Sequence, residues 1–365
     1  MRKSESFPSF SQNIQLCLTL EEIMDALNSY IANAHSLFLV HGKRSYQSCG
    51  AKSLFDDIIQ SHGLISTEYD DFTENPKKED VDAGVDLLVN CNPEIIIAVG
   101  GGSVMDMAKL VRYYSGSQAH LLAMPTTAGT GAESTQFAVC YIDGVKHSIS
   151  DRSILPDDVI LFPGFIYGNS RYLMSCTGFD ALAQSIEAYW NINATQESDD
   201  YALCAIQALF PILNKKVPSN EDFIALVRGA NYAGRAINIT RTTVPHALSY
   251  TLTSKYRYPH GHAVALTFPF FFKYNLEGSI DLFKGKDFNA YTAKMNQLRQ
   301  LLHVDEEPFL MMQKFVNQLG LGFDVNRDFD DKTVVDGLNV ERAKNTPIAI
   351  NKQVIIEAVK SIRNI

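Results

Sequence analysis

Ile95-Ile-Ile-Ala-Val-Gly-Gly-Gly-Ser-Val-Met-Asp-Met-Ala-Lys109 is the most informative segment for the fold of the first half of this chain. Its five leading apolar residues predict a buried strand, and the three glycines behind them predict a tight turn into a helix. Gly100, Gly101, Gly102 and Ser103 would let the backbone and the helix N-terminus approach a pyrophosphate closely. The string is neither G-x-G-x-x-G nor a P-loop, so a plain strand-to-helix turn remains an alternative.

Strands of the same kind flank this stretch on both sides. Leu37-Phe-Leu-Val40 and Leu121-Leu-Ala-Met124 are short apolar runs followed by turn residues, the pattern of βαβ units on a largely parallel sheet. Open α/β sheets bind their ligands beyond the carboxyl ends of the strands. We therefore expect residues 1–166 to form an α/β, Rossmann-like dinucleotide-binding domain whose function lies at those turns.

The second half of the chain has helical periodicity instead. Residues Asp180 to Trp190, Tyr201 to Leu213 and Phe309 to Leu319 show it most clearly. Turn-forming residues between Pro163 and Ser170 mark the boundary between the two halves. The sequence therefore predicts an all-helical domain over residues 167–365.

Composition excludes several classes of protein. With 365 residues, 46% of them hydrophobic, the chain can bury two cores, and its formal net charge of −9 argues against nucleic acid as a partner. The apolar runs are too short to cross a bilayer and no basic, apolar leader is present, so we expect a cytoplasmic protein without a membrane partner. Six cysteines without a C-x-x-C pair are expected to be small buried residues rather than disulfides or zinc ligands.

A second loop, rich in hydroxyls and glycines, follows the run that ends at Met124. Pro125-Thr-Thr-Ala-Gly-Thr-Gly-Ala-Glu133 places Thr126, Thr127 and Thr130 where they can donate hydrogen bonds to the ribose and phosphates of a nucleotide. A Ser/Thr turn with a helix cap is the alternative. Two such loops on successive strands favour a dinucleotide.

Four polar residues of the helical half could hold a metal ion. Asp180 and Gln184 are four residues apart, so both side-chain oxygens lie on one face of the predicted helix. His246 and His260, from later segments, would add two imidazoles to a compact site for a divalent ion. Spacing alone leaves open that each residue is an ordinary cap or a satisfied polar group.

Together these motifs resemble the family of iron-containing alcohol dehydrogenases, within the wider dehydroquinate synthase-like fold. The similarity spans most of the chain. It is carried by the glycine motif Gly100–Lys109, the second loop Pro125–Glu133, the strand Lys146–Ile149, the helical segment Gly178–Glu187, the histidine segments Pro245–Tyr250 and Pro259–His262, and the C-terminal segment Glu341–Pro347.

The resemblance implies that Asp180, Gln184, His246 and His260 bind a divalent metal. Gln184 stands where the family usually has a histidine. Its amide oxygen is neutral, as imidazole is, but it is a harder and weaker donor. Fe²⁺ is the expected ion, and Mn²⁺, Mg²⁺ and Zn²⁺ remain alternatives.

A nicotinamide cofactor is also implied, held by the glycine motif with Asp106, by the threonines of the second loop, and by Lys146. In members of this family that use NAD, we expect an Asp at the position near Gly42. The carboxylate of that Asp would repel the 2′-phosphate of NADP. Gly42 leaves room for that phosphate, and Lys43, Arg44 and Ser45 offer charge and donors, so we predict NADP(H) over NAD(H). The alternative for Lys43 and Arg44 is a solvated turn, and the alternative for Lys146 is an ordinary surface lysine.

In the mechanism that the resemblance implies, the metal polarises an aldehyde carbonyl and the nicotinamide delivers hydride to its carbon. His262 or Tyr250 would protonate the product through water, unless their roles are structural. The segments around Gln184 and His246 resemble the branch that reduces phosphonoacetaldehyde to 2-hydroxyethylphosphonate. Arg241 and Lys255 would bind the phosphonate of that substrate.

Two other functions remain open at this point. A lyase resembling dehydroquinate synthase shares the fold but would consume no NADPH. A non-catalytic, dinucleotide-binding relative is compatible with the weaker ligand Gln184. For the assembly we expect a homodimer, in which residues 1–12 help to cover an edge strand of the sheet.

Overall fold

The computed structural model describes residues 12–365 of the chain. Two compact units meet in sequence between Asn169 and Ser170. The first unit is built on a parallel sheet with helices, and the second is built from helices. The predicted fold class, an α/β part followed by a helical part, is therefore confirmed.

Six parallel strands form the main sheet of the first unit, in the order β1-β8-β5-β4-β2-β3, and β6 and β7 form a separate antiparallel hairpin. The three strands predicted from apolar runs are β2, β4 and β5. The strand bounds are β1 (Asn13–Leu16), β2 (Ser36–His41), β3 (Ile65–Tyr69), β4 (Ile95–Gly100), β5 (His120–Pro125), β6 (Phe137–Ile142), β7 (Val145–Ser150) and β8 (Asp158–Leu161).

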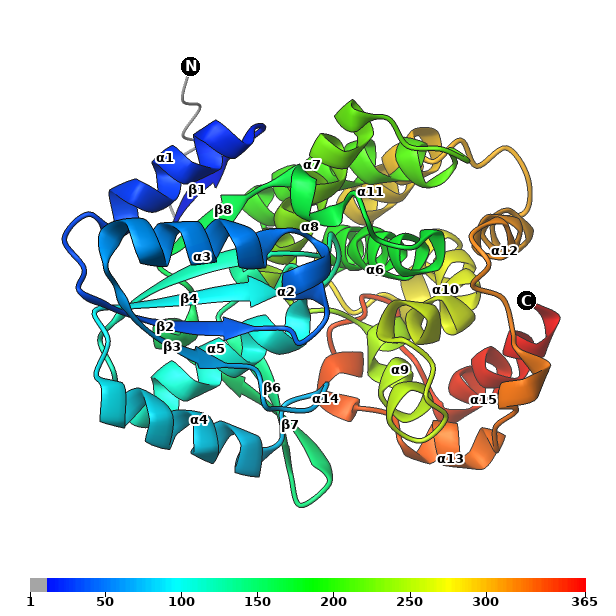
Figure 1. The fold of residues 1–365 in the computed structure, drawn as a ribbon. Helices are drawn as coiled ribbons and strands as arrows, with labels where there is room; N and C mark the ends of the chain where they lie inside the picture. Colours follow the sequence, from blue (N-terminus) through cyan, green and yellow to red (C-terminus); the bar gives the residue numbers. More distant parts are fainter. Residues whose placement is uncertain (1–11) are drawn as a thin grey trace. The chain divides into compact units, whose positions relative to one another are not determined.

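Helices cover both faces of this sheet (Figure 1). Because side chains alternate along a strand, Leu39 and Ile97 enter one core with Phe55 of α3, whereas Phe38 and Ile96 are buried on the opposite face. This alternation explains how continuous apolar runs serve two cores. The helices of the unit are α1 (Leu20–Ile31), α2 (Ser45–Ser48), α3 (Ala51–His62), α4 (Lys78–Cys91) and α5 (Gly102–Ser115).

The register of β4 with β5 brings the two glycine-containing loops together. Val99 pairs with Met124 and Gly100 pairs with Pro125, so both loops leave the same edge of the sheet from neighbouring positions. The Thr126 N–H donates to the Gly100 carbonyl at 2.9 Å and extends this pairing by one step. The site that the sequence predicted at these turns is therefore contiguous in space.

The second unit is organised around α6, which packs against α7, α8 and α10. Most of α6 is buried around its whole circumference, as expected for a helix in the middle of a domain. The helices are α6 (Arg171–Trp190), α7 (Gln196–Leu213), α8 (Asn220–Thr240), α9 (Val244–Ser254), α10 (His260–Leu276), α11 (Phe288–Leu301), α12 (Pro308–Gln318), α13 (Asp331–Asp336), α14 (Val340–Ala343) and α15 (Lys352–Ser361).

The structure also bears on the expectations about membrane-spanning helices, cysteines and the edge of the sheet. Among residues 12–365, no helix is both long and apolar enough to cross a membrane. None of the six cysteines, which all lie within residues 12–365, forms a disulfide. Cys49 and Cys91 are half-buried, and the expectation of burial is wrong for Cys204, which is exposed on α7. β1 lies at an edge of the sheet. Nearly all of the segment expected to cover that edge in a dimer, residues 1–11, lies outside the described residues.

Candidate functional site

Helix α6 presents Asp180 and Gln184 on one face, and both side chains are buried. The amide nitrogen of Gln184 donates to Asp180 Oδ2 at 3.2 Å. That bond fixes the orientation of the amide, because a flipped amide would set its oxygen against the carboxylate. Within the described part of the chain, Gln184 Oε1 is buried and has no hydrogen-bond partner. A buried oxygen of this kind needs a partner, and a cation would supply one.

Two histidines from other helices complete the cluster. His246 Nε2, on α9, lies 3.1 Å from Asp180 Oδ1, and His260 Nε2, at the first position of α10, lies 3.7 Å from the same atom. One ligand atom from each of Asp180, His246 and His260 lies within 4.8 Å of the other two. The structure thus brings together all four residues that the sequence singled out as metal ligands.

Glu187 contacts the cluster through His246, on the side of the ring opposite Nε2. It is fully buried, one turn beyond Gln184, and its carboxylate pairs with His246 Nδ1 and accepts from the Thr243 N–H and hydroxyl at 2.6 and 2.7 Å. Burial alone would lower the pKa of His246, but Glu187 and Asp180 outweigh it and raise that pKa to about 9. With Nδ1 bound to Glu187, the imidazole directs Nε2 toward the other ligands.

A close approach of α10 to α6 positions His260. A Cβ atom on Gly261 would lie 1.9 Å from the Cys176 carbonyl oxygen and 3.1 Å from Asp180 Cβ, so only glycine fits at this crossing. The hydroxyl of Ser249 lies 3.4 Å from His260 Nδ1 and steadies the ring from α9. The first turn of α10 can therefore bring its histidine beside the α6 carboxylate.

The donor set fits a divalent cation. One carboxylate, two imidazoles and one amide oxygen are ligands that Fe²⁺, Mn²⁺ and Zn²⁺ all accept. The partnerless oxygen of Gln184 and the carboxylate-backed imidazole of His246 are the two observations that favour an ion here over an ordinary polar core.

The structure does not support His262 as a proton donor. Its Nδ1 lies 2.8 Å from the Tyr172 hydroxyl and its Nε2 lies 2.8 Å from the Gly322 carbonyl, which only accepts. Burial lowers the pKa of His262, and both of its ring nitrogens have partners, the Tyr172 hydroxyl and the Gly322 carbonyl. His262 links α10 to Tyr172 of α6 and to Gly322, as expected if its role is structural. Tyr250, one turn after His246 on α9, remains a candidate donor.

The two predicted phosphonate ligands lie toward opposite ends of α9. Arg241 is the last residue before the Thr242-Thr243 entry to that helix, whereas Lys255 is its C-cap. Lys255 is exposed and follows His246 by nine residues, which places it about 14 Å farther along the helix axis. The structure therefore separates Lys255 from His246 along α9, and its phosphonate contact stays a prediction.

Two residues near the cluster escaped the sequence-based prediction. Glu187 lies on the α6 face of Asp180 and Gln184, three residues beyond Gln184, so helical spacing could have identified it. Arg342 lies on α14 and its Nη1 donates to the Thr242 hydroxyl at 2.8 Å. No local signal could have revealed a contact that spans 100 residues of sequence.

The two loops of the first unit form a compact cradle. A Cβ on Gly101 would lie 3.4 Å from Thr127 Oγ1, and a Cβ on Gly102 would lie 2.9 Å from Thr130 Oγ1. Both threonine hydroxyls therefore lie against the first turn of α5, whose N–H groups point outward. The Ser103 hydroxyl accepts from the Asn75 N–H at 3.2 Å, and the buried Thr126 Oγ1 has no partner among the described residues. Such an arrangement of donors suits a phosphate.

Asp106, which the sequence predicts to contact the cofactor, lies on α5 and makes contacts within the first unit. Its carboxylate accepts from the Val139 N–H at 3.0 Å, and Lys109 Nζ lies 3.9 Å away, so it joins α5 to β6. Burial raises the pKa of Asp106, while Lys109 and Lys146 act in the opposite direction. The Asp106 side chain is 15% exposed, and its predicted contact with the cofactor stays a prediction. Lys146 lies on β7, close enough to stabilise that carboxylate.

At the end of β2, Gly42 and Ser45 are in close contact, and a Cβ on Gly42 would lie 2.4 Å from Ser45 Oγ. Lys43 is exposed and pairs at 2.8 Å with Asp71, a residue after β3 that is still more exposed. This ion pair was not anticipated. It keeps the Lys43 ammonium at the carboxyl ends of the strands, where the sequence predicted a phosphate ligand.

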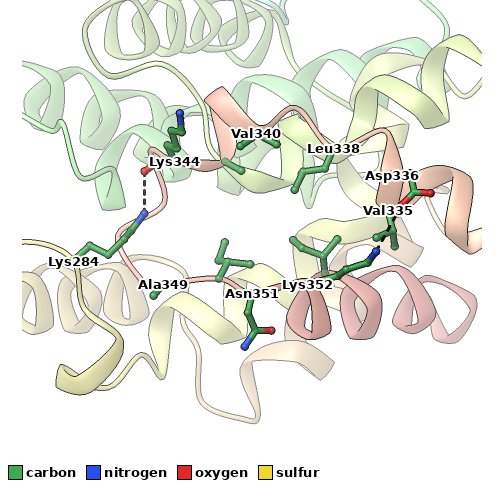
Figure 2. Close-up of a pocket in the computed structure, with 12 residues that line it drawn as sticks. Lys284, Val335, Asp336, Leu338, Val340, Lys344, Ala349, Asn351 and Lys352 are labelled. Atoms are coloured by element: carbon green, nitrogen blue, oxygen red, sulfur yellow. Dashed lines mark hydrogen bonds and ion pairs between the residues drawn. The ribbon is translucent and has the colours of Figure 1, made fainter.

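A cavity of about 460 Å³ lies elsewhere in the second unit, between α13, α14 and α15. Figure 2 shows its apolar lining, including Leu338 and Val340, with Lys284, Lys344 and Lys352 around it. Lys284 donates to the Lys344 carbonyl and Lys352 faces Asp336 at 3.9 Å. None of the four predicted metal ligands lines this cavity, so it is not the site described above.

Comparison with known proteins assigns both halves of the chain to one family. Residues 18–163 match the family model for iron-containing alcohol dehydrogenase, and residues 174–356 match the model for the C-terminal part of the Fe-containing alcohol dehydrogenase family. Phosphonoacetaldehyde reductase of Streptomyces viridochromogenes is 31% identical over 212 residues, or 50% of this chain and 53% of that protein. Aldehyde-alcohol dehydrogenase 2 of Entamoeba histolytica is 27% identical over 290 residues, or 70% of this chain and 33% of that protein.

The chain thus spans between about a third and a half of the length of these curated relatives. Solved structures are similar along nearly their whole length. An iron-containing alcohol dehydrogenase superposes with a TM-score of 0.81 at 23% identity, covering 99% of both chains. Sulfoacetaldehyde reductase from Bifidobacterium kashiwanohense, solved with NAD⁺, has a TM-score of 0.80 at 24% identity and covers 96% of both chains. These two similarities establish the fold.

Proposed function

The chain belongs to the family of iron-containing alcohol dehydrogenases, and we propose that it is a metal-dependent oxidoreductase that interconverts an aldehyde and an alcohol with a nicotinamide cofactor. The observation that carries this proposal is the cluster of Asp180, Gln184, His246 and His260, of which the first three are buried. An ion there would act as a Lewis acid toward a carbonyl oxygen.

The residues of the chain supply binding and orientation for this reaction. Asp180 would provide the single negative charge of the site, and Glu187 would hold the His246 ring in a fixed orientation and tautomer. The Tyr250 hydroxyl, on the His246 face of α9, would relay a proton to the product oxygen. Asp180, Gln184 and His246 are buried, whereas His260 is half-buried and leaves the site open on its side.

The loops of the first unit would bind the dinucleotide. Thr127 and Thr130 lie against the N-terminus of α5, where a pyrophosphate would meet backbone N–H groups and hydroxyls. The proposed preference is NADP(H) over NAD(H). Its support is Lys43, whose exposed pair with Asp71 is screened by solvent and would yield to a doubly charged 2′-phosphate.

The proposed substrate is a short aldehyde with an anionic end, and phosphonoacetaldehyde is the member of this class to test. Arg241, just before the helix that carries His246, supports this choice, together with the 31% identity to a phosphonoacetaldehyde reductase over half of the chain. The alcohol formed would be 2-hydroxyethylphosphonate.

The test is an assay of NADPH consumption by anaerobically purified protein loaded with Fe²⁺. Phosphonoacetaldehyde and the uncharged propanal are offered in parallel, and each is repeated with NADH. We expect turnover with both aldehydes, faster with the phosphonate and with NADPH. No consumption of either cofactor with Fe²⁺, Mn²⁺ or Zn²⁺ would overturn the proposal and favour a lyase or a non-catalytic relative.

A further inference from the structure

Two arginines from distant segments meet at the beginning of α9. Arg241 is the C-cap of α8, and Arg342 lies on α14, 101 residues later in the sequence. The guanidinium of Arg342 donates to the Thr242 hydroxyl, and Asn345 Nδ2 donates to the Thr242 carbonyl at 2.9 Å. The α14 segment is therefore bound to the residue that follows Arg241.

The two positive charges are close enough to influence each other. Burial and the charge of Arg342 lower the pKa of Arg241, and Tyr250 acts in the opposite direction. Tyr250 is one helical turn from His246 on the same face of α9. The backbone of Arg241 lies five residues before His246, directly before the Thr242-Thr243 entry to α9.

The backbone holds Arg241 in an unusual position. Its φ of 67° lies in the left-handed region, which costs free energy for a residue with a side chain. The Arg241 carbonyl accepts from Asn191 Nδ2 at 3.1 Å and from the Thr240 hydroxyl at 2.8 Å, so both neighbouring helices maintain this conformation. Two residues on, Thr243 binds Glu187, which orients His246. Arg241 is thus rigidly connected to the cluster.

We propose that Arg241 and Arg342 together form the subsite for the anionic end of the substrate, a phosphonate or similar tetrahedral anion whose aldehyde lies at the metal cluster. Two partly buried guanidinium groups repel each other, and a dianion between them turns that repulsion into attraction. Arginine suits such an anion because its planar fork can donate two hydrogen bonds to neighbouring oxygens. This inference rests on the proposed function and names its substrate class.

The variants Arg241→Gln and Arg342→Gln test the subsite. We expect each to lower kcat/KM for phosphonoacetaldehyde about 10- to 100-fold more than kcat/KM for propanal, mainly through KM, since a charge-assisted hydrogen bond is lost. Lys344→Gln is the matched control, because it removes a positive charge two residues from Arg342 where the side chain pairs with Glu341. Equal losses for both aldehydes would show that Arg342 only holds α14 in place, and would overturn the inference.

A binding measurement separates this inference from the reaction itself. Methylphosphonate, which lacks an aldehyde, is titrated into metal-loaded wild-type protein by calorimetry. We expect binding that is weakened about tenfold or more in both arginine variants. If methylphosphonate fails to bind while propanal is still reduced, the subsite is wrong and the proposed function stands. If it binds through the arginines while neither aldehyde is reduced, the subsite stands and the proposed function is wrong.

Discussion

At position 184 an amide lies among the predicted metal ligands, and its oxygen is buried without a protein partner within the described residues. If that oxygen binds the ion, replacing it with imidazole should strengthen binding. We predict that Gln184→His retains its metal about tenfold better against a chelator, because imidazole is a stronger donor to first-row ions. Metal content after graded dialysis against a chelator measures this. Retention equal to that of the wild type would show that residue 184 is not a ligand.

Glu187 acts on the ion through His246. The substitution Glu187→Gln keeps the size and an acceptor for Thr243 but removes the charge that orients the imidazole. We predict metal affinity about 10- to 100-fold weaker than in the wild type, the usual effect of losing such an outer carboxylate. Competition with a fluorescent chelator gives the affinity, and circular dichroism checks that the fold persists. An unchanged affinity would contradict the positioning role.

The four residues that the structure brings together all carried a local signal in the sequence. Asp180 and Gln184 share a helix face, and the segments around His246 and His260 carry a family pattern, so all four could be selected before the fold was known. His262 belongs to the same pattern as His260, yet its partners Tyr172 and Gly322 are 90 and 60 residues away. Sequence cannot distinguish a catalytic imidazole from a structural one when its partners are this remote.

Among the elements, the crossing of α6 and α10 depends on Gly261. The variant Gly261→Ala would place a methyl group against the Cys176 carbonyl, so the helices must separate. We predict a loss of at least about 1–3 kcal/mol of stability, the usual cost of overpacking, and with it weaker metal binding. Thermal unfolding measures this, with Gly168→Ala as the control because a Cβ there meets open space. Equal melting temperatures for the two variants would contradict the close approach.

Helix α9 separates the two cations that the sequence placed together. Lys255 is exposed at the C-terminal end, about 14 Å beyond His246 along the axis. We predict that Lys255→Gln leaves the ratio of kcat/KM for phosphonoacetaldehyde to that for propanal within about twofold of the wild type, because surface charges at this distance are screened. A fall in that ratio comparable to that of the Arg241 variant would restore Lys255 to the site.

Elements with a strong pattern were predicted well, and others were not. Buried parallel strands are continuous apolar runs, which is why β2, β4 and β5 were found within a residue or two. The full extent of α6 was missed, because a helix buried on all sides lacks an amphipathic period and its start at Arg171 follows a Ser170 cap. The antiparallel pairing of β6 with β7 was also missed, since pairing direction is not encoded in one strand.

For the whole molecule, the sheet edge at β1 raises the question of assembly. β1 pairs with β8 on one side, and no strand among residues 12–365 pairs with it on the other. An open edge invites pairing with another chain, so we predict a homodimer. Light scattering coupled to size exclusion would give twice the mass of the chain, and a single-chain mass at micromolar concentration would contradict the prediction.

We propose that the metal cluster of the second unit, together with a nicotinamide cofactor, carries out the reaction. The most direct test strips the protein of metal and reloads it with one equivalent of Fe²⁺, for the wild type and for His246→Ala, and follows NADPH consumption with phosphonoacetaldehyde and propanal. We predict activity that disappears with the ion, returns with it in the wild type, and does not return in His246→Ala. Turnover that survives removal of the metal, or that His246→Ala retains in full, would contradict the claim.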